Sequence, residues 1–339
     1  DMCTLPLVET GVAVEGEYPD IGNFWMTTNN PCDANMMDNS AMYRALSNNG
    51  QKAVHPLTTP LMYDDPTTKE LGVHEIESAI DFMEKQFGRK FDWDAFIRHC
   101  EATNQVNREE MERWDIYCKT DNGCLNAICQ GMYRIYFYQQ GGTKYFAKSS
   151  AKTLKLMYEC VEKNIKPFPN TRHRALAWSC GSTYYCHGVG WLYNCWGILA
   201  VINMDSLTGH NLIDTEDRET MMEDLADWYS HTPMRTHTVG GNRHIMQMWE
   251  TAEKFNCDTI IMYDDIGCKG MAGAQGLLEE EFAKHRDKFH IIWMPHSLMD
   301  CRIVPTNEAR RAVNQYMTDV LHEEPVDPSL VDFDDTLGW

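Results

Sequence analysis

Residues 258–269 read Asp-Thr-Ile-Ile-Met-Tyr-Asp-Asp-Ile-Gly-Cys-Lys, and this stretch decides the fold. Its apolar start, Asp258–Tyr263, predicts a buried strand, and a helix is expected at Ala272–His285. Apolar strands that alternate with helices are typical of a parallel sheet covered by helices. Cys268 lies in the turn between the two elements. We therefore expect its thiol at the carboxyl edge of the sheet, where open α/β sheets bind ligands.

The same alternation continues on both sides of this stretch. Further strands are expected at Arg174–Trp178, Ile198–Met204 and His290–Met294, with helices at Gly188–Trp196, Glu216–Tyr229, Gly241–Phe255 and Asn307–Leu321. The second half of the chain is therefore predicted to form an α/β domain with a parallel sheet.

A shorter unit of the same kind precedes this domain. Asn23–Thr28 and Lys52–Leu57 are expected as strands around a helix at Cys32–Asn48, and Glu75–Met83 begins a series of amphipathic helical patterns. We therefore predict an α/β fold of two Rossmann-like parallel-sheet domains, the first truncated, joined by a helical block. The predicted parts are a first α/β domain over 1–66, the helical block over 67–170, a second α/β domain over 171–325 and an acidic tail over 326–339.

Composition excludes several classes of protein. The chain has 339 residues and a net charge of −20, which argues against nucleic-acid partners because these bind basic surfaces. No apolar run approaches the roughly 18–20 residues of a membrane span. Thirteen cysteines with irregular spacing and no visible signal peptide indicate reduced thiols in a cytoplasmic protein. Neither a GxGxxG nor a P-loop pattern is present, so nucleotide binding by this chain is not expected.

Three cysteines stand out by their surroundings. Cys32 follows Asn29-Asn30-Pro31, Cys268 follows Gly267, and Cys3 lies near the first residue. A turn at the start of a helix offers backbone N–H groups and favours thiolate over thiol. Three such thiolates without a fourth suggest an iron–sulfur cluster that leaves one iron open for chemistry. Hydrogen bonds from backbone N–H groups would raise the reduction potential of such a cluster, and a dry anionic pocket would lower it.

Other interpretations of the cysteines stay open. Cys180, Cys186 and Cys195 follow a different strand and form a rival ligand set. Free cysteine is also among the most buried residue types, and it usually behaves as a small apolar residue. A structural role is expected for the cysteines on helical stretches or beside a strand start, which are Cys100, Cys118, Cys129, Cys160 and Cys257.

Several short motifs along the chain together resemble one family of enzymes. They are Asp1-Met2-Cys3 followed by Gly11, Asn29–Asp33, Phe87–Asp92, Ile266–Lys269 and Met294–Arg302. In order and spacing they resemble the subunits of 2-hydroxyacyl-CoA dehydratases and class I benzoyl-CoA reductases. The last motif departs from the family pattern E-x-D-x-x-D-x-R, because Pro295 and Ser297 stand at its acidic positions.

The resemblance implies an anaerobic enzyme complex with defined parts. It implies a [4Fe–4S] cluster held by Cys3, Cys32 and Cys268, and an acyl-CoA or aryl-CoA substrate. It also implies a homologous second cluster-bearing subunit and a separate activator subunit that hydrolyses ATP. Reduced ferredoxin would be the electron donor. Trp114–Cys118, Tyr133–Tyr138 and Ala177–His187 look like the smaller subunit of benzoyl-CoA reductases. That branch implies an oxidoreductase that reduces the aromatic ring by single-electron steps to a cyclic dienoyl-CoA.

Three alternatives belong to other functional classes. A 2-hydroxyacyl-CoA dehydratase subunit would be a lyase on the same scaffold. An electron-relay subunit would carry a cluster without its own substrate site. A two-lobed binding module would carry no metal, and its cysteines would belong to the core.

Proton donors are expected near the cluster. His187, His296 and Tyr185 follow predicted strands and are candidates, although a lone histidine is more often structural. The basic segment Thr171–Arg174 could contact CoA phosphates or form an ordinary surface loop, and Asp300 and Arg302 could form a structural ion pair.

Overall fold

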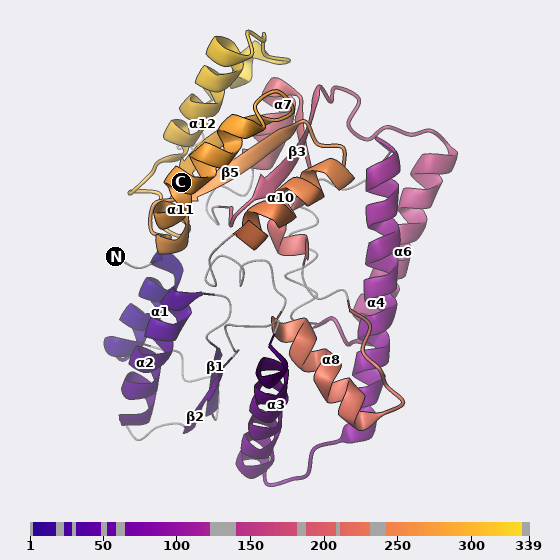
Figure 1. Cartoon of the computed structure of the whole chain (residues 1–339), viewed down its shortest axis with the longest axis vertical. Helices are drawn as coiled ribbons and strands as arrows, with labels where there is room; N and C mark the ends of the chain where they lie inside the picture. The colour runs from indigo at the N-terminus through magenta and orange to yellow at the C-terminus, as the bar shows by residue number, and fades with distance from the viewer. Residues whose placement is uncertain are drawn as a thin grey trace.

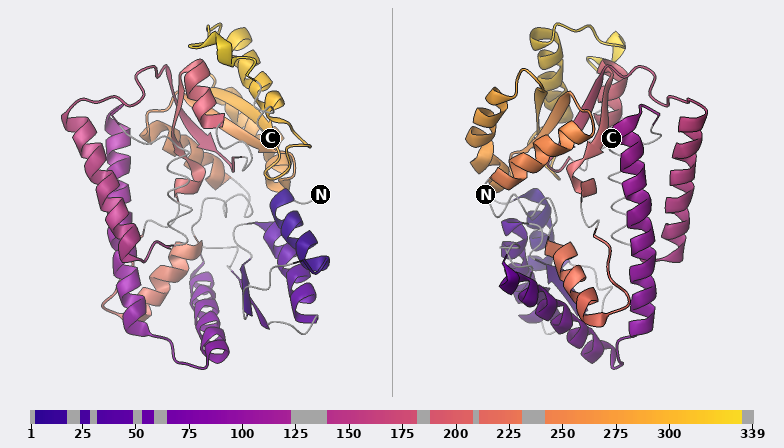
Figure 2. Two further views of the ribbon diagram at one scale, coloured as in Figure 1. Left: turned by 180° about the vertical axis from the view of Figure 1, so that it is seen from behind. Right: turned by 45° about the vertical axis from the view of Figure 1, so that its right-hand side comes forward.

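A computed structural model of the chain describes residues 3–17, 24–28, 32–48, 53–58, 65–122, 140–181, 188–207, 211–230 and 242–333 (Figure 1). These residues form two parallel sheets with helices around and between them, which confirms the α/β class. Figure 2 shows the four-stranded sheet and its helices at one end, and the smaller sheet at the other end. None of the described helices combines the length and the apolar character that crossing a membrane requires.

The larger sheet contains the stretch that decides the fold. Its strands lie in the order β4 (Ile198–Asn203), β3 (His173–Trp178), β5 (Thr259–Asp265) and β6 (His290–His296), and every neighbouring pair is parallel. The carboxyl ends of all four strands therefore meet at one edge. Asp265 pairs with His296 at that edge, and β5 carries the chain directly from the sheet into the Cys268 turn.

Helices cover both faces of this sheet. On one face lie α10 (Asn242–Lys254) and α11 (Lys269–Lys284), and on the other face lie α7 (Gly188–Trp196) and α12 (Thr306–Gln315). Successive side chains of a strand point to opposite faces, so each strand contributes to both cores. Such burial on two sides requires the continuous apolar strands that the sequence contains.

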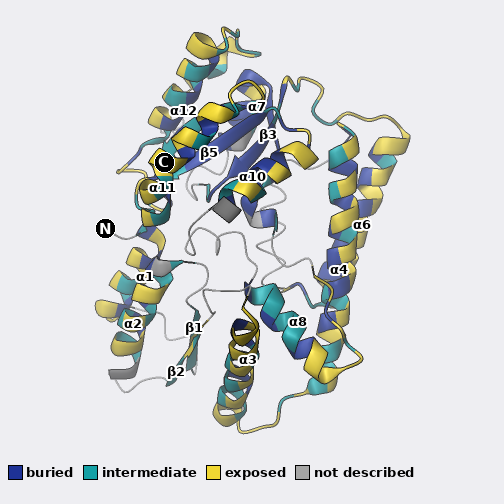
Figure 3. Ribbon diagram, in the orientation of Figure 1, coloured by how far each residue is buried: buried dark blue, intermediate teal, exposed yellow. Residues whose placement is uncertain are grey.

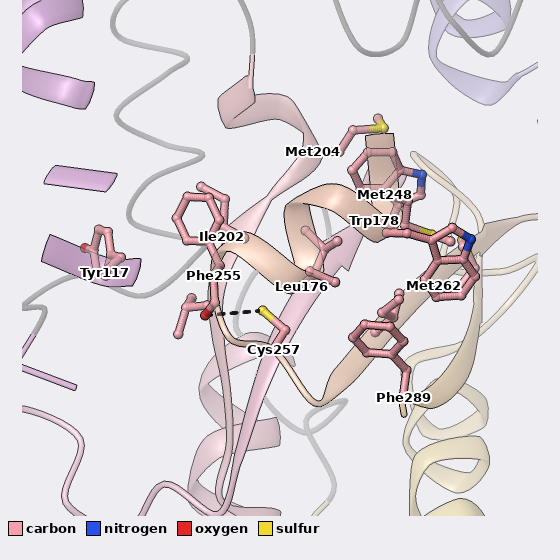
Figure 4. Packing of buried hydrophobic residues seen from close by; sticks show 14 of the residues in the cluster. Tyr117, Leu176, Trp178, Ile202, Met204, Met248, Phe255, Cys257, Met262 and Phe289 are labelled. Carbon is pink, nitrogen blue, oxygen red and sulfur yellow. Dashed lines mark hydrogen bonds between the residues drawn. The ribbon is translucent and has the colours of Figure 1, made fainter. Parts of the chain in front are cut away.

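Strand β3 shows how the two cores divide. Leu176 and Trp178 are fully buried on the face of α10 and α11, and Figure 4 shows them among Met204, Met248 and Met262. Ala175 and Ala177 face α7 and α12 instead. Small side chains on that face leave room for the large Trp191 and Trp196 of α7.

The smaller sheet pairs β1 (Phe24–Thr28) with β2 (Ala53–Leu57) in parallel. Helix α2 (Asp33–Asn48) connects the two strands and packs on them. Helix α1 (Thr4–Val14) was not expected from the sequence and packs on α2. The hydroxyl of Thr10 donates a hydrogen bond to Asp38, which fixes one helix on the other.

The helical block lies between the sheets and begins with well-capped helices. Helix α3 (Pro66–Phe87) has the Asp65 carboxylate on the Thr67 N–H at its start and Gly88 in the left-handed conformation at its end. Asp92 is the N-cap residue of helix α4 (Trp93–Lys119). Its 27 residues give a length of about 40 Å. Helix α6 (Lys144–Glu162) packs along α4.

Helix α4 contacts structure at both ends of the molecule. Near its start, Cys100 packs with Ile213 and Met221, and near its end Ile116 and Tyr117 belong to the core of the larger sheet. Helix α8 (Arg218–Ser230) contacts α3, so the chain returns from the larger sheet to the other end of the molecule. The exact residue limits of the three domains stay a prediction.

Short elements complete the described chain. The 3-10 turn η1 (Met204–Leu207) follows β4, and the π-helical turn η2 (Tyr316–Val320) extends α12. The acidic tail contains the 3-10 turn η3 (Pro328–Leu330), which lies against α7. There the indole N–H of Trp191 donates to the Leu330 carbonyl at 2.8 Å. The described part of the tail thus lies against α7. Figure 3 colours each described residue by how far it is buried.

Gly197 joins α7 to β4 in a conformation that only glycine adopts readily. Its φ is +74°, and an added Cβ would lie 2.7 Å from the Asn170 carbonyl oxygen. We expect Gly197→Ala to lower the free energy of unfolding by about 1–3 kcal/mol. Gly190→Ala is the control, because Gly190 lies in the same region on α7 with open space around it. That variant should be neutral or more stable. Urea denaturation measures both, and equal effects of the two variants would contradict the argument.

His173 forms a buried ion-pair cluster at the amino edge of the larger sheet. Its Nδ1 lies 3.0 Å from Asp258 Oδ2 and its Nε2 lies 2.8 Å from Glu323 Oε1. Both contacts require N–H groups, so the imidazolium form satisfies them. The hydrogen bond with Asp258 is the largest cause that raises the pKa of His173, and burial opposes it.

Stability should therefore fall as the pH rises. A folded-state pKa above the unfolded value of about 6.5 means that protonation of His173 stabilises the fold below that pH. This contribution disappears as the pH rises through the folded pKa. We expect the difference in free energy of unfolding between wild type and His173→Gln to shrink as the pH rises above about 6.5. His74→Gln, on the exposed face of α3, is the control and should show no such trend. A difference that is constant with pH would contradict this prediction.

Candidate functional site

Each of the three selected cysteines lies directly before a helix. Cys3 precedes α1, Cys32 precedes α2 and Cys268 precedes α11. The Cys3 carbonyl accepts from the Leu7 N–H, and the carbonyls of Cys32 and Cys268 accept corresponding bonds in α2 and α11. The first N–H groups of a helix have no partner inside it, so each thiol lies among free donors at the positive end of a helix dipole.

The fold brings these three helix starts together. In Figures 1 and 2, α1 lies next to α11, although the two helices belong to opposite ends of the chain. Burial raises the pKa of the Cys3 thiol to about 12, and the charges of Cys32 and Cys268 add to this increase. Burial also raises the pKa of Cys268, to which the charge of Cys32 again contributes. The three thiols therefore form one electrostatically connected group.

Backbone N–H groups at this site point toward sulfur. The Leu5 N–H lowers the pKa of Cys3, and the N–H groups of Met271 and Gly270 lower that of Cys268, so each opposes the effect of burial. Donors of this kind stabilise a negatively charged sulfur. Burial of the thiols and repulsion between their charges, however, raise the pKa values more than these N–H donors lower them. Three thiolates at this place would therefore be stable only with a positively charged group between them.

The residues fit an iron–sulfur cluster better than a single ion. Among the described residues, no group of three or more His, Cys, Asp or Glu side chains is arranged around one metal ion. In a cluster, each cysteine binds a different iron atom, so the sulfurs need not converge on one point. The half-buried thiols, their N–H donors and their mutual electrostatic influence match this requirement.

Side-chain hydrogen bonds join the start of α1 to the edge of the larger sheet. The Thr4 and Ser297 hydroxyl oxygens are 3.4 Å apart and both residues are buried. The Met299 N–H donates to Thr4 Oγ1 at 3.0 Å. Next to them, the Cys3 thiol donates to Asp265 Oδ2 at 3.7 Å. These contacts hold the Cys3 loop against the Cys268 side of the site.

Most other described cysteines lie in the core. Cys195 is fully buried on α7 and its pKa is raised to about 12 by burial, so it does not reach the sheet edge. Cys180 is half-buried, and Cys186 lies outside the described residues. The rival ligand set as a whole therefore stays a prediction. Cys100, Cys160 and Cys257 are buried and Cys118 is half-buried, as expected for structural residues.

His296 is the one proton-donor candidate within the described residues. It ends β6 with 3% of its surface exposed, and neither ring nitrogen has a hydrogen-bond partner of good geometry. Burial lowers its pKa, while the Asp265 charge and nearby backbone of Ser297 and Cys180 oppose this shift. Its ring packs edge-on against Tyr263 at 5.5 Å. The other two candidates, Tyr185 and His187, lie outside the described residues.

The basic segment before β3 has a structural role. Arg172 donates to the Glu324 carbonyl and lies 3.6 Å from Glu323. Arg174 contacts Asp121 and two backbone carbonyls at the amino edge of the sheet, opposite the cysteine edge. At the other edge, Arg302 forms a two-pronged ion pair with Asp300 that lowers the pKa of that carboxyl to about 2. This arrangement favours the interpretation of Asp300 and Arg302 as a structural ion pair.

Asp265, Thr4 and Ser297 were missed by the sequence reasoning. Asp264-Asp265 is the signal that could have identified the first, because two acidic residues end an otherwise apolar strand. Thr4 and Ser297 carry no comparable signal, since isolated hydroxyl residues are common in turns.

A comparison with protein families gives one match. The model of a family described as 2-hydroxyglutaryl-CoA dehydratase, D-component, matches residues 1–295. A search of curated proteins finds no match for this chain.

Proposed function

Because the chain belongs to the 2-hydroxyglutaryl-CoA dehydratase D-component family, we propose that it is the iron–sulfur subunit of an enzyme complex that acts on a CoA thioester by single-electron chemistry. The proposal is supported by the position of Cys3, Cys32 and Cys268 directly before three helices, and by the contact of the Cys3 thiol with Asp265 beside the Cys268 turn. These thiols would hold a [4Fe–4S] cluster and leave one iron without a cysteine ligand.

The protein's own residues would prepare the site for this group. When bound, the cluster supplies single electrons at low potential to the thioester. The N–H donors of Leu5, Gly270 and Met271 stabilise the sulfurs, and the apolar surroundings limit access of water. His296, buried beside this edge, would hold and transfer a proton.

The complex would contain further subunits. We propose a homologous second cluster-bearing subunit and an activator that hydrolyses ATP, with reduced ferredoxin as the electron source. Reduction of an aromatic ring or an unactivated thioester needs a potential near the lower limit of iron–sulfur clusters, roughly −700 mV. An ordinary ferredoxin cannot supply this alone, which is the physical reason for coupling to ATP.

Two reactions are compatible with this scaffold. Reduction of an aryl-CoA such as benzoyl-CoA to a cyclic dienoyl-CoA is supported by the polar-aromatic segments around Trp114–Cys118 and Ala177–His187. Dehydration of a (R)-2-hydroxyacyl-CoA is supported by the description of the matching family. A subunit that relays electrons to a substrate site on its partner fits the same cysteine geometry.

One anaerobic experiment separates these alternatives. The complex is purified with its activator, its iron and sulfide are measured, and it is given benzoyl-CoA or a (R)-2-hydroxyacyl-CoA with ATP and reduced ferredoxin. Formation of a dienoyl-CoA with net consumption of electrons supports the reductase. Loss of water without net consumption of electrons supports the dehydratase. A colourless chain without iron would reject both and leave the metal-free binding module.

A further inference from the structure

Asp265 connects two of the three cysteine loops. It is the last residue of β5 and only 4% of its surface is exposed. Its Oδ1 accepts from the Gly267 N–H at 3.1 Å, and its Oδ2 accepts from the Cys3 thiol at 3.7 Å. The two oxygens of one carboxylate thus reach the Cys268 turn and the Cys3 thiol, and the contact with Cys3 spans 262 residues of the sequence.

The Oδ1 contact shapes the turn that carries Cys268. A carboxylate that accepts from the N–H two residues further along closes an Asx turn. The Asp265 carbonyl also accepts from the Cys268 N–H at 2.9 Å, which closes the same turn through the backbone. Cys268 is therefore held at the start of α11 by both the side chain and the backbone of Asp265.

The Oδ2 contact places a negative charge beside the thiols. Cys3 lies against this oxygen, and the charge of Asp265 also acts on Cys268. Reduction adds a further negative charge to a cluster, so a buried carboxylate at this distance disfavours it. The N–H donors at Leu5, Gly270 and Met271 act in the opposite direction.

We propose that Asp265 is a positioning residue that shapes the Cys268 turn and, through its charge beside Cys3, lowers the reduction potential of the cluster that these cysteines would hold. This inference rests on the proposed function, because it needs a cluster at these cysteines. It adds that one side chain sets both the geometry and the potential of the site. A low potential is what the reduction of a CoA thioester requires, so the carboxylate would favour the reaction.

The test is a redox titration of the anaerobic protein, followed by EPR. Asp265→Asn keeps the size of the side chain and the oxygen that accepts from Gly267, but it removes the charge. We expect it to retain iron and to be reduced at least tenfold more easily, which is a rise of 59 mV or more for a one-electron couple. Asp265→Glu keeps the charge and should stay closer to wild type. Asp264→Asn is the control, because Asp264 is the strand neighbour whose side chain points to the opposite face.

The outcomes separate this inference from the proposed function. A wild-type protein without iron would reject the proposed function together with the inference. A wild-type protein with a cluster, and an Asp265→Asn potential that is unchanged or no higher than that of Asp264→Asn, would overturn the inference alone. Loss of iron in Asp265→Asn with retention in Asp265→Glu would also overturn it, because the charge would then serve assembly of the cluster and not its potential. Retained iron in Asp265→Asn together with the expected rise in reduction potential supports the inference.

Discussion

The Cys268→Ser variant, purified without oxygen, should fold like wild type but lose most of its iron, by about tenfold or more. Cys268 begins α11, and its half-buried thiol faces the N–H groups of Gly270 and Met271. A serine hydroxyl has the same shape, but it does not ionise near neutral pH and is a poor ligand for iron. Iron and sulfide analysis together with EPR measures the loss, and turnover of the CoA ester should fall with it.

Cys301→Ser is the matched control for this prediction. Cys301 is exposed and lies in the turn that follows β6, so its replacement removes a thiol without touching the three helix starts. It should keep the iron content and the EPR signal of wild type. An unchanged spectrum in Cys268→Ser would exclude Cys268 from the ligand set.

The second large effect is expected from His296→Gln. If this buried histidine transfers a proton at the cysteine edge, product formation should fall by about 10²–10⁴-fold. Glutamine is similar in size and polarity but cannot act as an acid or base. Iron content should stay at the wild-type value, because no described contact connects the His296 ring nitrogens to a cysteine thiol.

A control on the same face of the molecule is available. His285 stacks on Trp249 at the other end of α11, about 24 Å along the helix from Cys268. His285→Gln should leave product formation unchanged. If His296→Gln lowered activity only in proportion to a loss of iron or of folded protein, a role in proton transfer would be contradicted.

Much of the larger domain could be predicted from the sequence. The helix at Gly188–Trp196 has the predicted limits, and the four strands lie within a few residues of their expected positions. These elements have strong signals because both faces of the sheet are buried, which requires uninterrupted apolar strands. Turn residues between them limit the choice of boundaries further.

Other elements could not be predicted in the same way. Helix α1 contains Pro6, Gly11 and several β-branched valines, which disfavour an isolated helix, and it is stabilised by packing on α2. The amphipathic patterns after Glu75–Met83 include one helix of 27 residues, α4, whose length was not predicted. Its two ends pack against different cores, and such long-range contacts leave no local sequence signal.

The local position of each candidate cysteine was predictable from the sequence, but the arrangement of the three in space was not. The thiols of Cys32 and Cys268 were selected because each precedes a helix, and this local geometry is confirmed. Their approach to Cys3 depends on how the two ends of the molecule meet. The contacts of Thr4 and Asp265 that secure this approach join residues nearly the whole chain apart, so only the folded structure reveals them.

The distribution of the site over the chain also determines when it can be completed during synthesis. Cys3 and Cys32 leave the ribosome early, but the turn of Cys268 takes shape only when β5 pairs with β3 and β6. A half-built site would offer two thiols and no closed pocket. A cluster that uses all three thiols could therefore form only after β6 has been synthesised, and a cell would have to protect the earlier thiols from oxidation until then.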